Sequence, residues 1–288
     1  MTSNERSGVY TIPQSGTRAV FLSIIFWVCF LGLLFGSGIF IVKSFPASWE
    51  RFVYGISSTL SALMATWLLL KIDKKTFAEI NLVWQNSTLK NFVKGVLLGS
   101  FIFGILLSVL LLFAGLEIQN SRQGMSLSAA AAYLSIIPLA LAEEIAFRAF
   151  PFIKLERAFG LRITQWIVAI AFAAYHVVIG WGLLAAFLGP GIWAFVFGLS
   201  ARWSGGIAIP TGLHVALNVW QPLVGMSSGT YSSVWILKSS HEISPGQISK
   251  ADFTGIVLQG VILLAAILLT EYYIKKRTRH IENKETDE

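Results

Sequence analysis

The feature that most constrains the fold is a succession of apolar runs, each close to the length of a membrane-spanning helix. A helix needs about 20 apolar residues to cross the hydrocarbon core of a bilayer. The runs cover residues 19–42, 52–72, 92–116, 127–153, 163–179, 183–200, 206–225 and 253–274. They predict an all-α, polytopic membrane protein built as a single bundle of about eight transmembrane helices.

The composition agrees with this fold class and limits the possible partners. Hydrophobic residues make up 55% of the chain and charged residues 13%, whereas soluble domains carry about 25% charged residues. If the N-terminus is cytoplasmic and the runs alternate in direction, sixteen Lys and Arg residues lie inside and five outside. This bias predicts a multi-pass protein with both termini cytoplasmic. The compact chain carries no organelle-retention signal, which favours a prokaryotic cell membrane. The bias also explains the net charge of +7 without nucleic acid as a partner.

The domain organisation follows from the same runs. The first run is longer than the core of a signal peptide and lacks a small-residue cleavage site, so it predicts a retained helix. We expect a cytoplasmic N-terminal tail at 1–18, a transmembrane bundle at 19–274 and a basic cytoplasmic C-terminal tail at 275–288. Gly189-Pro190-Gly191 interrupts the sixth run, which is expected to be broken or partly re-entrant.

One apolar run contains three charges within six residues, namely Glu143, Glu144 and Arg148. Each charge at mid-bilayer costs about 3 kcal/mol on insertion scales, so the cluster requires an explanation. Glu144 and Arg148 are four residues apart and can neutralise each other on one helix face. Glu143 lies about 100° further round the helix and lacks such a partner. The pair is therefore interpreted as structural and Glu143 as the candidate for chemistry.

Three further polar residues lie within apolar runs: His176, His214 and Asn218. His214 and Asn218 are four apart and share a helix face. With a rise of about 1.5 Å per residue, Glu143 and both histidines can lie in one layer, nearer the cytoplasmic side. This depth predicts a cavity that opens toward the cytoplasm.

These side chains are sufficient for hydrolysis of an amide bond. A Glu with a His can hold and deprotonate water, and a second His with an Asn can donate hydrogen bonds to the oxyanion that forms. One Glu and two His could instead hold zinc with water as the fourth ligand. Each residue also has a structural interpretation, since intramembrane His and Asn often only join helices.

Three short motifs occur in order along the chain. They are Glu143-Glu144-x-x-x-Arg148, Phe172-x-x-x-His176 and His214-x-x-x-Asn218. We interpret residues 127–222, which contain the three motifs, as the motif-bearing core. With all three motifs in order, this core resembles the family of CAAX-processing proteases and bacteriocin-immunity proteins, called Abi or CPBP.

The resemblance implies a CAAX-type intramembrane glutamate protease. It implies that Glu143 and His176 activate water and that His214 and Asn218 form the oxyanion hole. Glu144 and Arg148 would support the site. The implied substrate is a membrane-associated or C-terminal peptide, prenylated or not, surrounded by membrane lipids. No metal cofactor is expected, and a zinc metalloprotease is the alternative mechanism.

Two non-proteolytic functions stay open on the sequence. A bacteriocin self-immunity or scaffold protein could keep the cluster as a brace between helices. A small proton-coupled transporter could use Glu143 and His176 as a proton relay. The first alternative predicts that Glu143→Gln loses stability rather than activity, and the second predicts proton-coupled flux in liposomes.

Overall fold

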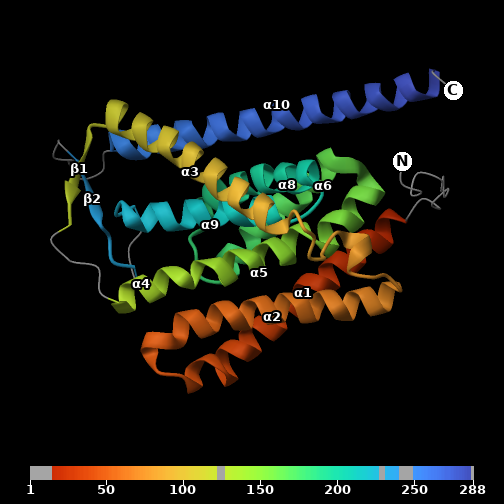
Figure 1. The fold of residues 1–288 in the computed structure, drawn as a ribbon, viewed down its shortest axis with the longest axis horizontal. Coiled ribbons are helices and arrows are strands. Elements are labelled where there is room, and N and C mark those ends of the chain that lie inside the picture. Colours follow the sequence, from red (N-terminus) through yellow and green to blue (C-terminus); the bar gives the residue numbers. More distant parts are fainter. Residues whose placement is uncertain (1–14, 122–126, 227–230, 240–248, 287–288) are drawn as a thin grey trace.

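The computed structural model describes residues 15–121, 127–226, 231–239 and 249–286, and it is nearly all-α (Figure 1). The elements are, in chain order, α1 (Gly16–Phe40), η1 (Val42–Ser44), α2 (Ala47–Asp73), η2 (Ala78–Ile80), α3 (Thr88–Phe113), β1 (Leu116–Asn120), α4 (Leu127–Leu134), α5 (Ile136–Arg148), α6 (Phe150–Val178), α7 (Leu183–Ala186), η3 (Phe187–Gly191), α8 (Ile192–Ser204), α9 (Ala208–Leu223), β2 (Trp235–Ser239) and α10 (Lys250–Thr286).

The bundle has two distinct ends. Figure 1 shows α1 beginning and α10 ending at one end, which we call the terminal end, and β1 and β2 at the other, which we call the sheet end. The basic tail expected from residue 275 continues α10 as a helix, and residues 1–14 of the expected N-terminal tail lie outside the described residues. Which end faces the cytoplasm stays a sequence-based prediction.

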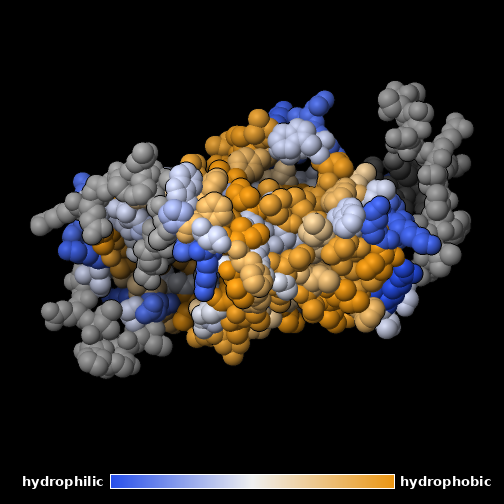
Figure 2. All heavy atoms as spheres, turned by 90° about the horizontal axis from the view of Figure 1, so that it is seen from below, coloured by the Kyte–Doolittle hydropathy of each residue, from blue (hydrophilic) through white to orange (hydrophobic). Residues whose placement is uncertain are grey.

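The surface is that of a multi-pass integral membrane protein. Large apolar side chains are exposed along α1, α3 and α10, including Phe40, Leu112 and Leu268. On the face that Figure 2 shows, hydrophobic residues cover most of the middle and hydrophilic residues gather toward the two ends. Since soluble proteins rarely expose such large contiguous apolar areas, this band is the surface that meets lipid.

The expected count of about eight spans is not confirmed. Within the described residues, five helices are long and apolar enough to cross a membrane: Gly16–Ser44, Trp49–Asp73, Thr88–Phe113, Leu183–Ser204 and Lys250–Arg279. The interruption expected at Gly189-Pro190-Gly191 is the π-helical turn η3 between α7 and α8. Proline lacks the backbone N–H that a regular α-helix uses there, and the wider turn accommodates it.

The remaining apolar runs, which carry the motifs, fold differently from simple spans. The run at 127–153 divides into α4 and α5 and continues into α6. α5 has 13 residues and α9 has 16, which at about 1.5 Å per residue is shorter than a bilayer core of about 30 Å. α6 has 29 residues but is kinked at Gly160, whose φ of 75° is non-helical. The motif-bearing helices α5 and α9 are therefore short, largely buried elements inside the bundle.

Glycines hold α9 close against α3. A Cβ atom on Gly95 of α3 would lie 2.1 Å from the Ile209 carbonyl oxygen, and one on Gly212 of α9 would lie 2.1 Å from the Phe92 carbonyl oxygen. A Cβ atom on Gly99 would likewise meet the carbonyl oxygen of Leu213, the neighbour of His214, at 2.7 Å. Small residues permit this backbone approach in membrane helices. The contact of α3 with α9 therefore determines where His214 lies.

A two-stranded sheet is the departure from the all-α prediction. β1 and β2 pair antiparallel, with Leu116 opposite Ser239 and Asn120 opposite Trp235. β1 follows α3 and β2 follows α9, and the backbone N–H of Val234 bonds to the carbonyl of Leu223 at the end of α9. Because α3 and α9 run side by side, the segments that leave them meet and satisfy their backbone groups by pairing.

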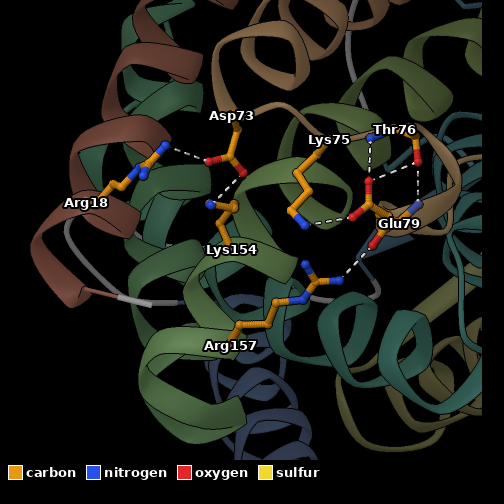
Figure 3. Close-up of polar contacts among 7 residues, drawn as sticks. All are labelled: Arg18, Asp73, Lys75, Thr76, Glu79, Lys154 and Arg157. Atoms are coloured by element: carbon orange, nitrogen blue, oxygen red, sulfur yellow. Dashed lines mark hydrogen bonds and ion pairs between the residues drawn. The ribbon is translucent and has the colours of Figure 1, made fainter. Parts of the chain in front are cut away.

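Charged side chains join three helices at the terminal end (Figure 3). Asp73 at the end of α2 accepts hydrogen bonds from Lys154 Nζ of α6 at 2.7 Å and from Arg18 Nη2 of α1 at 3.3 Å. The side chains of Lys154 and Asp73 are 3% and 4% exposed. Arg157 of α6 donates to the Glu79 carbonyl at 2.8 Å and fixes the connection between α2 and α3.

Candidate active site

The structure brings the predicted site residues together from three helices. α5 carries Glu143, Glu144 and Arg148, and it packs against both α6 and α9. α6 carries His176 near its end, and α9 carries His214 with Asn218 one turn further on. Glu143, His176, His214 and Asn218 all line one internal cavity.

Glu143 lies at the centre of this arrangement. Its Oε2 atom is 3.6 Å from Nε2 of His214 and 4.0 Å from Nε2 of His176. Its side chain is 15% exposed, against 8% for His176. These separations exceed a direct hydrogen bond, and a water molecule among the three groups could bond to each of them.

The main chain sets the orientation of His176. Nδ1 of His176 lies 2.8 Å from the carbonyl oxygen of Phe172, one helical turn earlier. A carbonyl can only accept, so Nδ1 carries the hydrogen and donates it. In the neutral imidazole Nε2 is then the acceptor, and this atom faces Glu143. The spacing within the Phe172-x-x-x-His176 motif thus determines which nitrogen is free for chemistry.

Glu144 bonds to two buried side chains, those of Arg148 and His214. The predicted pair with Arg148 forms, with 3.4 Å between Arg148 Nη1 and Glu144 Oε1, and both side chains are 0% exposed. The same Oε1 atom lies 2.8 Å from Nδ1 of His214. Helix spacing suggests an isolated Glu144–Arg148 pair, but in the structure Glu144 also bonds to Nδ1 of His214 and orients its ring.

Aromatic rings enclose these groups. The Arg148 guanidinium lies over the rings of Phe172 and Phe197, at 4.3 Å and 5.1 Å from their centroids. Phe197 also stacks on His214 with 4.6 Å between centroids, and Phe172 meets His176 edge-on at 4.6 Å. The two rings shield the guanidinium and strengthen the electrostatic interactions around it.

The cavity that these residues line measures about 560 Å³. Its other lining residues are mostly apolar and include Leu107, Leu139 and Leu217. It extends toward the sheet end, where Arg51 donates to the Tyr231 hydroxyl at 2.7 Å. Arg51 is at the opposite end of α2 from Asp73 and the chain termini. The expected cytoplasmic opening and the expected cytoplasmic termini therefore point to opposite ends of the bundle, and both stay predictions.

A smaller cavity of about 350 Å³ lies on the other side of the site, at the terminal end. Arg148 lines the smaller cavity and His214 lines the larger one. Glu144, which is 0% exposed, lies between Arg148 and His214 and bonds to both. The chain Arg148–Glu144–His214 therefore forms a wall between two cavities at opposite ends of the bundle.

Within the residues that the structure describes, no group of three or more His, Cys, Asp or Glu is arranged to hold a metal ion. In the zinc alternative the ligands would be Glu143, His176 and His214, and Glu143 Oε2 lies 4.0 Å and 3.6 Å from the Nε2 atoms of the two histidines. Whether the site uses zinc stays a question for chelation.

Several site features were missed by the sequence analysis. The Glu144–His214 bond joins residues 70 positions apart, and sequence alone gave no reason to pair them. Phe197 was missed because a single Phe in a Phe-rich chain carries no signal. The contact of Arg51 with Tyr231 links residues 180 positions apart.

The fold and the cluster together define a class: multi-pass, nearly all-α membrane proteins with a carboxylate–histidine cluster at the wall of an internal cavity. Residues 123–220 match the family described as type II CAAX prenyl endopeptidase Rce1-like. This match confirms the resemblance that the three motifs indicate and supports a protease. The matched segment is about a third of the chain and contains all six predicted site residues. A search of curated proteins finds no match.

Proposed function

We propose that this protein is an intramembrane endopeptidase that hydrolyses peptide bonds with a water molecule activated by Glu143. The observation that carries the proposal is the convergence of the Nε2 atoms of His176 and His214 on one oxygen of Glu143, with distances of 4.0 and 3.6 Å. The match of the same segment to a family of CAAX endopeptidases supports the reaction class.

Glu143 acts as the general base in this proposal. Water bound between Glu143 and Nε2 of His176 attacks the carbonyl carbon of the scissile bond and transfers a proton to the carboxylate. The attack forms a tetrahedral intermediate whose oxygen carries the negative charge. Glu143 then returns the proton to the leaving nitrogen, the C–N bond breaks, and an acid and an amine are released. No metal ion takes part.

His214 and Asn218 stabilise the oxyanion. In the imidazolium form both ring nitrogens of His214 donate, so Nδ1 can bond to Glu144 while Nε2 donates to the oxyanion. The side-chain amide of Asn218, one turn further along α9, supplies a second donor.

The substrate is a membrane-associated or C-terminal peptide whose scissile bond enters the larger cavity. The apolar lining of this cavity suits apolar side chains or a prenyl group near the cleavage site. The prenylated C-terminal peptide is proposed from the description of the matched family.

The decisive experiment measures cleavage by purified protein in nanodiscs. A panel of fluorogenic peptides, prenylated and not, is assayed with the wild type and with Glu143→Gln, with and without EDTA. We expect cleavage that survives EDTA and is lost in Glu143→Gln, while the thermal unfolding midpoint stays close to that of the wild type. Full activity of the variant would refute the mechanism. Activity that EDTA removes and zinc restores would establish a metalloprotease instead.

The same variant tests the non-enzymatic alternative. The bond between Glu144 and His214 joins α5 to α9, as a brace in an immunity or scaffold protein would. If the cluster is only a brace, Glu143→Gln lowers the unfolding midpoint and the wild type cleaves none of the peptides. Cleavage by the wild type with a stable, inactive variant excludes this alternative.

A further inference from the structure

The smaller cavity at the terminal end is unusually basic. It lies between α5, α6, α8, α10 and the connection that follows α2. Its charged lining residues are four arginines and one glutamate: Arg148, Arg157, Arg202, Arg277 and Glu156. A hollow with this excess of guanidinium groups favours an anion.

Arg148 supplies buried donors to this cavity. Its side chain is fully buried, and only Nη1 has a hydrogen-bond partner, Glu144. Nε and Nη2 have no partner among the described residues. Buried donors of a charged group are costly to leave unsatisfied, so an acceptor in the adjoining cavity would stabilise them.

The other charges in the lining are only partly neutralised. Glu156 is bound by Arg202 at 2.5 Å and neutralises that one arginine. Arg157 donates to the carbonyl oxygen of Glu79, a neutral group, so its positive charge is kept (Figure 3). Arg277 on α10 is exposed at the rim.

Two consecutive glycines also line the cavity. Gly205 ends α8 with a φ of 69°, a conformation that favours glycine, and a Cβ atom there would meet nothing within 4 Å. Gly205 and Gly206 both line the cavity. Its volume of about 350 Å³ lies at the lower end of the range for small-molecule sites, about 300–1,000 Å³.

We propose that this cavity binds a phosphate group, held by Arg148 in the interior and by Arg157 and Arg277 at the rim. Guanidinium groups bind phosphate oxygens bidentately, and three arginines from α5, α6 and α10 line this cavity. The phosphate can come from the headgroup of an anionic lipid at the terminal end of the bundle or from free inorganic phosphate.

The test uses the full chain purified in phosphate-free maltoside detergent at fixed ionic strength. Three probes are titrated: inorganic phosphate, dioctanoyl phosphatidylglycerol and the uncharged dioctanoylglycerol. The thermal unfolding midpoint and the dissociation constant are measured for each. We expect phosphatidylglycerol, inorganic phosphate or both to raise the midpoint, and dioctanoylglycerol to leave it unchanged. Stabilisation by the lipid alone identifies a headgroup site, and stabilisation by both identifies a site for the phosphate itself.

Two variants and a matched control locate the binding. Arg277→Gln and Arg157→Gln are each expected to weaken binding about ten-fold, the value of one lost charge-assisted hydrogen bond. Arg279→Gln removes the same charge from an exposed position of α10 outside the cavity lining and is expected to bind as the wild type does. The proposal is overturned if neither phosphate probe stabilises the protein, or if Arg279→Gln weakens binding as much as Arg277→Gln. These readouts require no proteolysis, so they stand apart from the proposed function.

Discussion

The side chain of Glu144 contacts both a structural partner and a residue of the candidate site. It is fully buried, paired with Arg148 on its own helix, and bonded to His214 on α9. If Glu144 only braces the helices, its loss affects stability alone. If it also positions the ring of His214 for catalysis, its loss lowers kcat as well.

Glu144→Gln therefore tests the role of this carboxylate. The amide keeps the shape but removes the negative charge from the group that bonds to Nδ1 of His214. We expect kcat to fall about 100-fold or more with little change in KM, since replacing the carboxylate behind a catalytic His costs about 10⁴ in one well-studied protease. Measuring kcat beside the unfolding midpoint separates the two roles, and loss of stability with an unchanged kcat would contradict the catalytic one.

The spacing of residues within a helix could be predicted from the sequence, but contacts between helices could not. The i, i+4 rule gave the Glu144–Arg148 pair and placed Glu143 on a different face. The bonds that assemble the site across helices, above all that of Glu144 with His214, depend on which helices are neighbours. No periodicity in a single run carries that information.

At the scale of the elements, the glycines between α3 and α9 position His214 and Asn218 without touching the chemistry. The sequence shows the Gly95-x-x-x-Gly99 spacing, yet such spacings are common in apolar helices and do not identify their partner. The structure identifies the partner of this α3 spacing as α9, because a side chain at Gly95 would collide with the carbonyl oxygen of Ile209.

Gly95→Ala and Gly104→Ala form a matched pair on α3. A methyl group at Gly95 meets backbone of α9, whereas one at Gly104 meets nothing within 4 Å. We expect Gly95→Ala to destabilise the protein by about 1–3 kcal/mol through overpacking and to lower activity by displacing α9. Gly104→Ala should be neutral or stabilising by about 0.5–1 kcal/mol. Equal unfolding midpoints in the two variants would refute the close contact between α3 and α9.

The charged residues that join α1, α2 and α6 at the terminal end give a second comparison. Asp73→Asn leaves Lys154, which is 3% exposed, without its counter-ion, and should cost about 3–5 kcal/mol. Arg18→Gln keeps the buried pair and removes a side chain that is 59% exposed, so it should cost under about 1 kcal/mol. Chemical unfolding of both variants checks this order, and equal costs would show that Arg18, rather than Lys154, is the main partner of Asp73.

The connection between α2 and α3 should respond to acid. Hydrogen bonds from Lys75 and from the Thr76 backbone lower the pKa of Glu79 to about 2, from an ordinary value of 4.5 (Figure 3). The stabilisation from this carboxylate is thus present above pH 4.5 and lost as the pH falls toward 2. After correction for the intrinsic pH dependence of amide exchange, the protection of residues 74–82 should fall over that interval in the wild type. Glu79→Gln should show low protection at every pH, and a flat wild-type protection profile would contradict the assignment.

At the scale of the whole molecule, membrane insertion and helix content were predictable from apolar runs, whereas the number of spans was not. A run of apolar residues shows that a segment avoids water, but not whether lipid or protein surrounds it. α5 and α9 avoid water inside the bundle, so they need not match the bilayer in length. The pairing of β1 with β2 was equally hidden, since it depends on α3 and α9 ending at the same place.

The wall between the two cavities has a consequence for the energy supply of the cell. If two cavities approach each other from opposite faces of a membrane and the groups between them can relay protons, the proton gradient across that membrane dissipates. Arginine keeps its proton in proteins, so we expect the fixed positive charge of Arg148 to repel an arriving proton and to block that route. Wild-type proteoliposomes should hold a pH gradient, as should Glu143→Gln, whereas Arg148→His should leak. A leak in the wild type as fast as in Arg148→His would refute this role. A buried arginine between the two cavities would then limit the proton leak through the bundle, whatever its part in the candidate site.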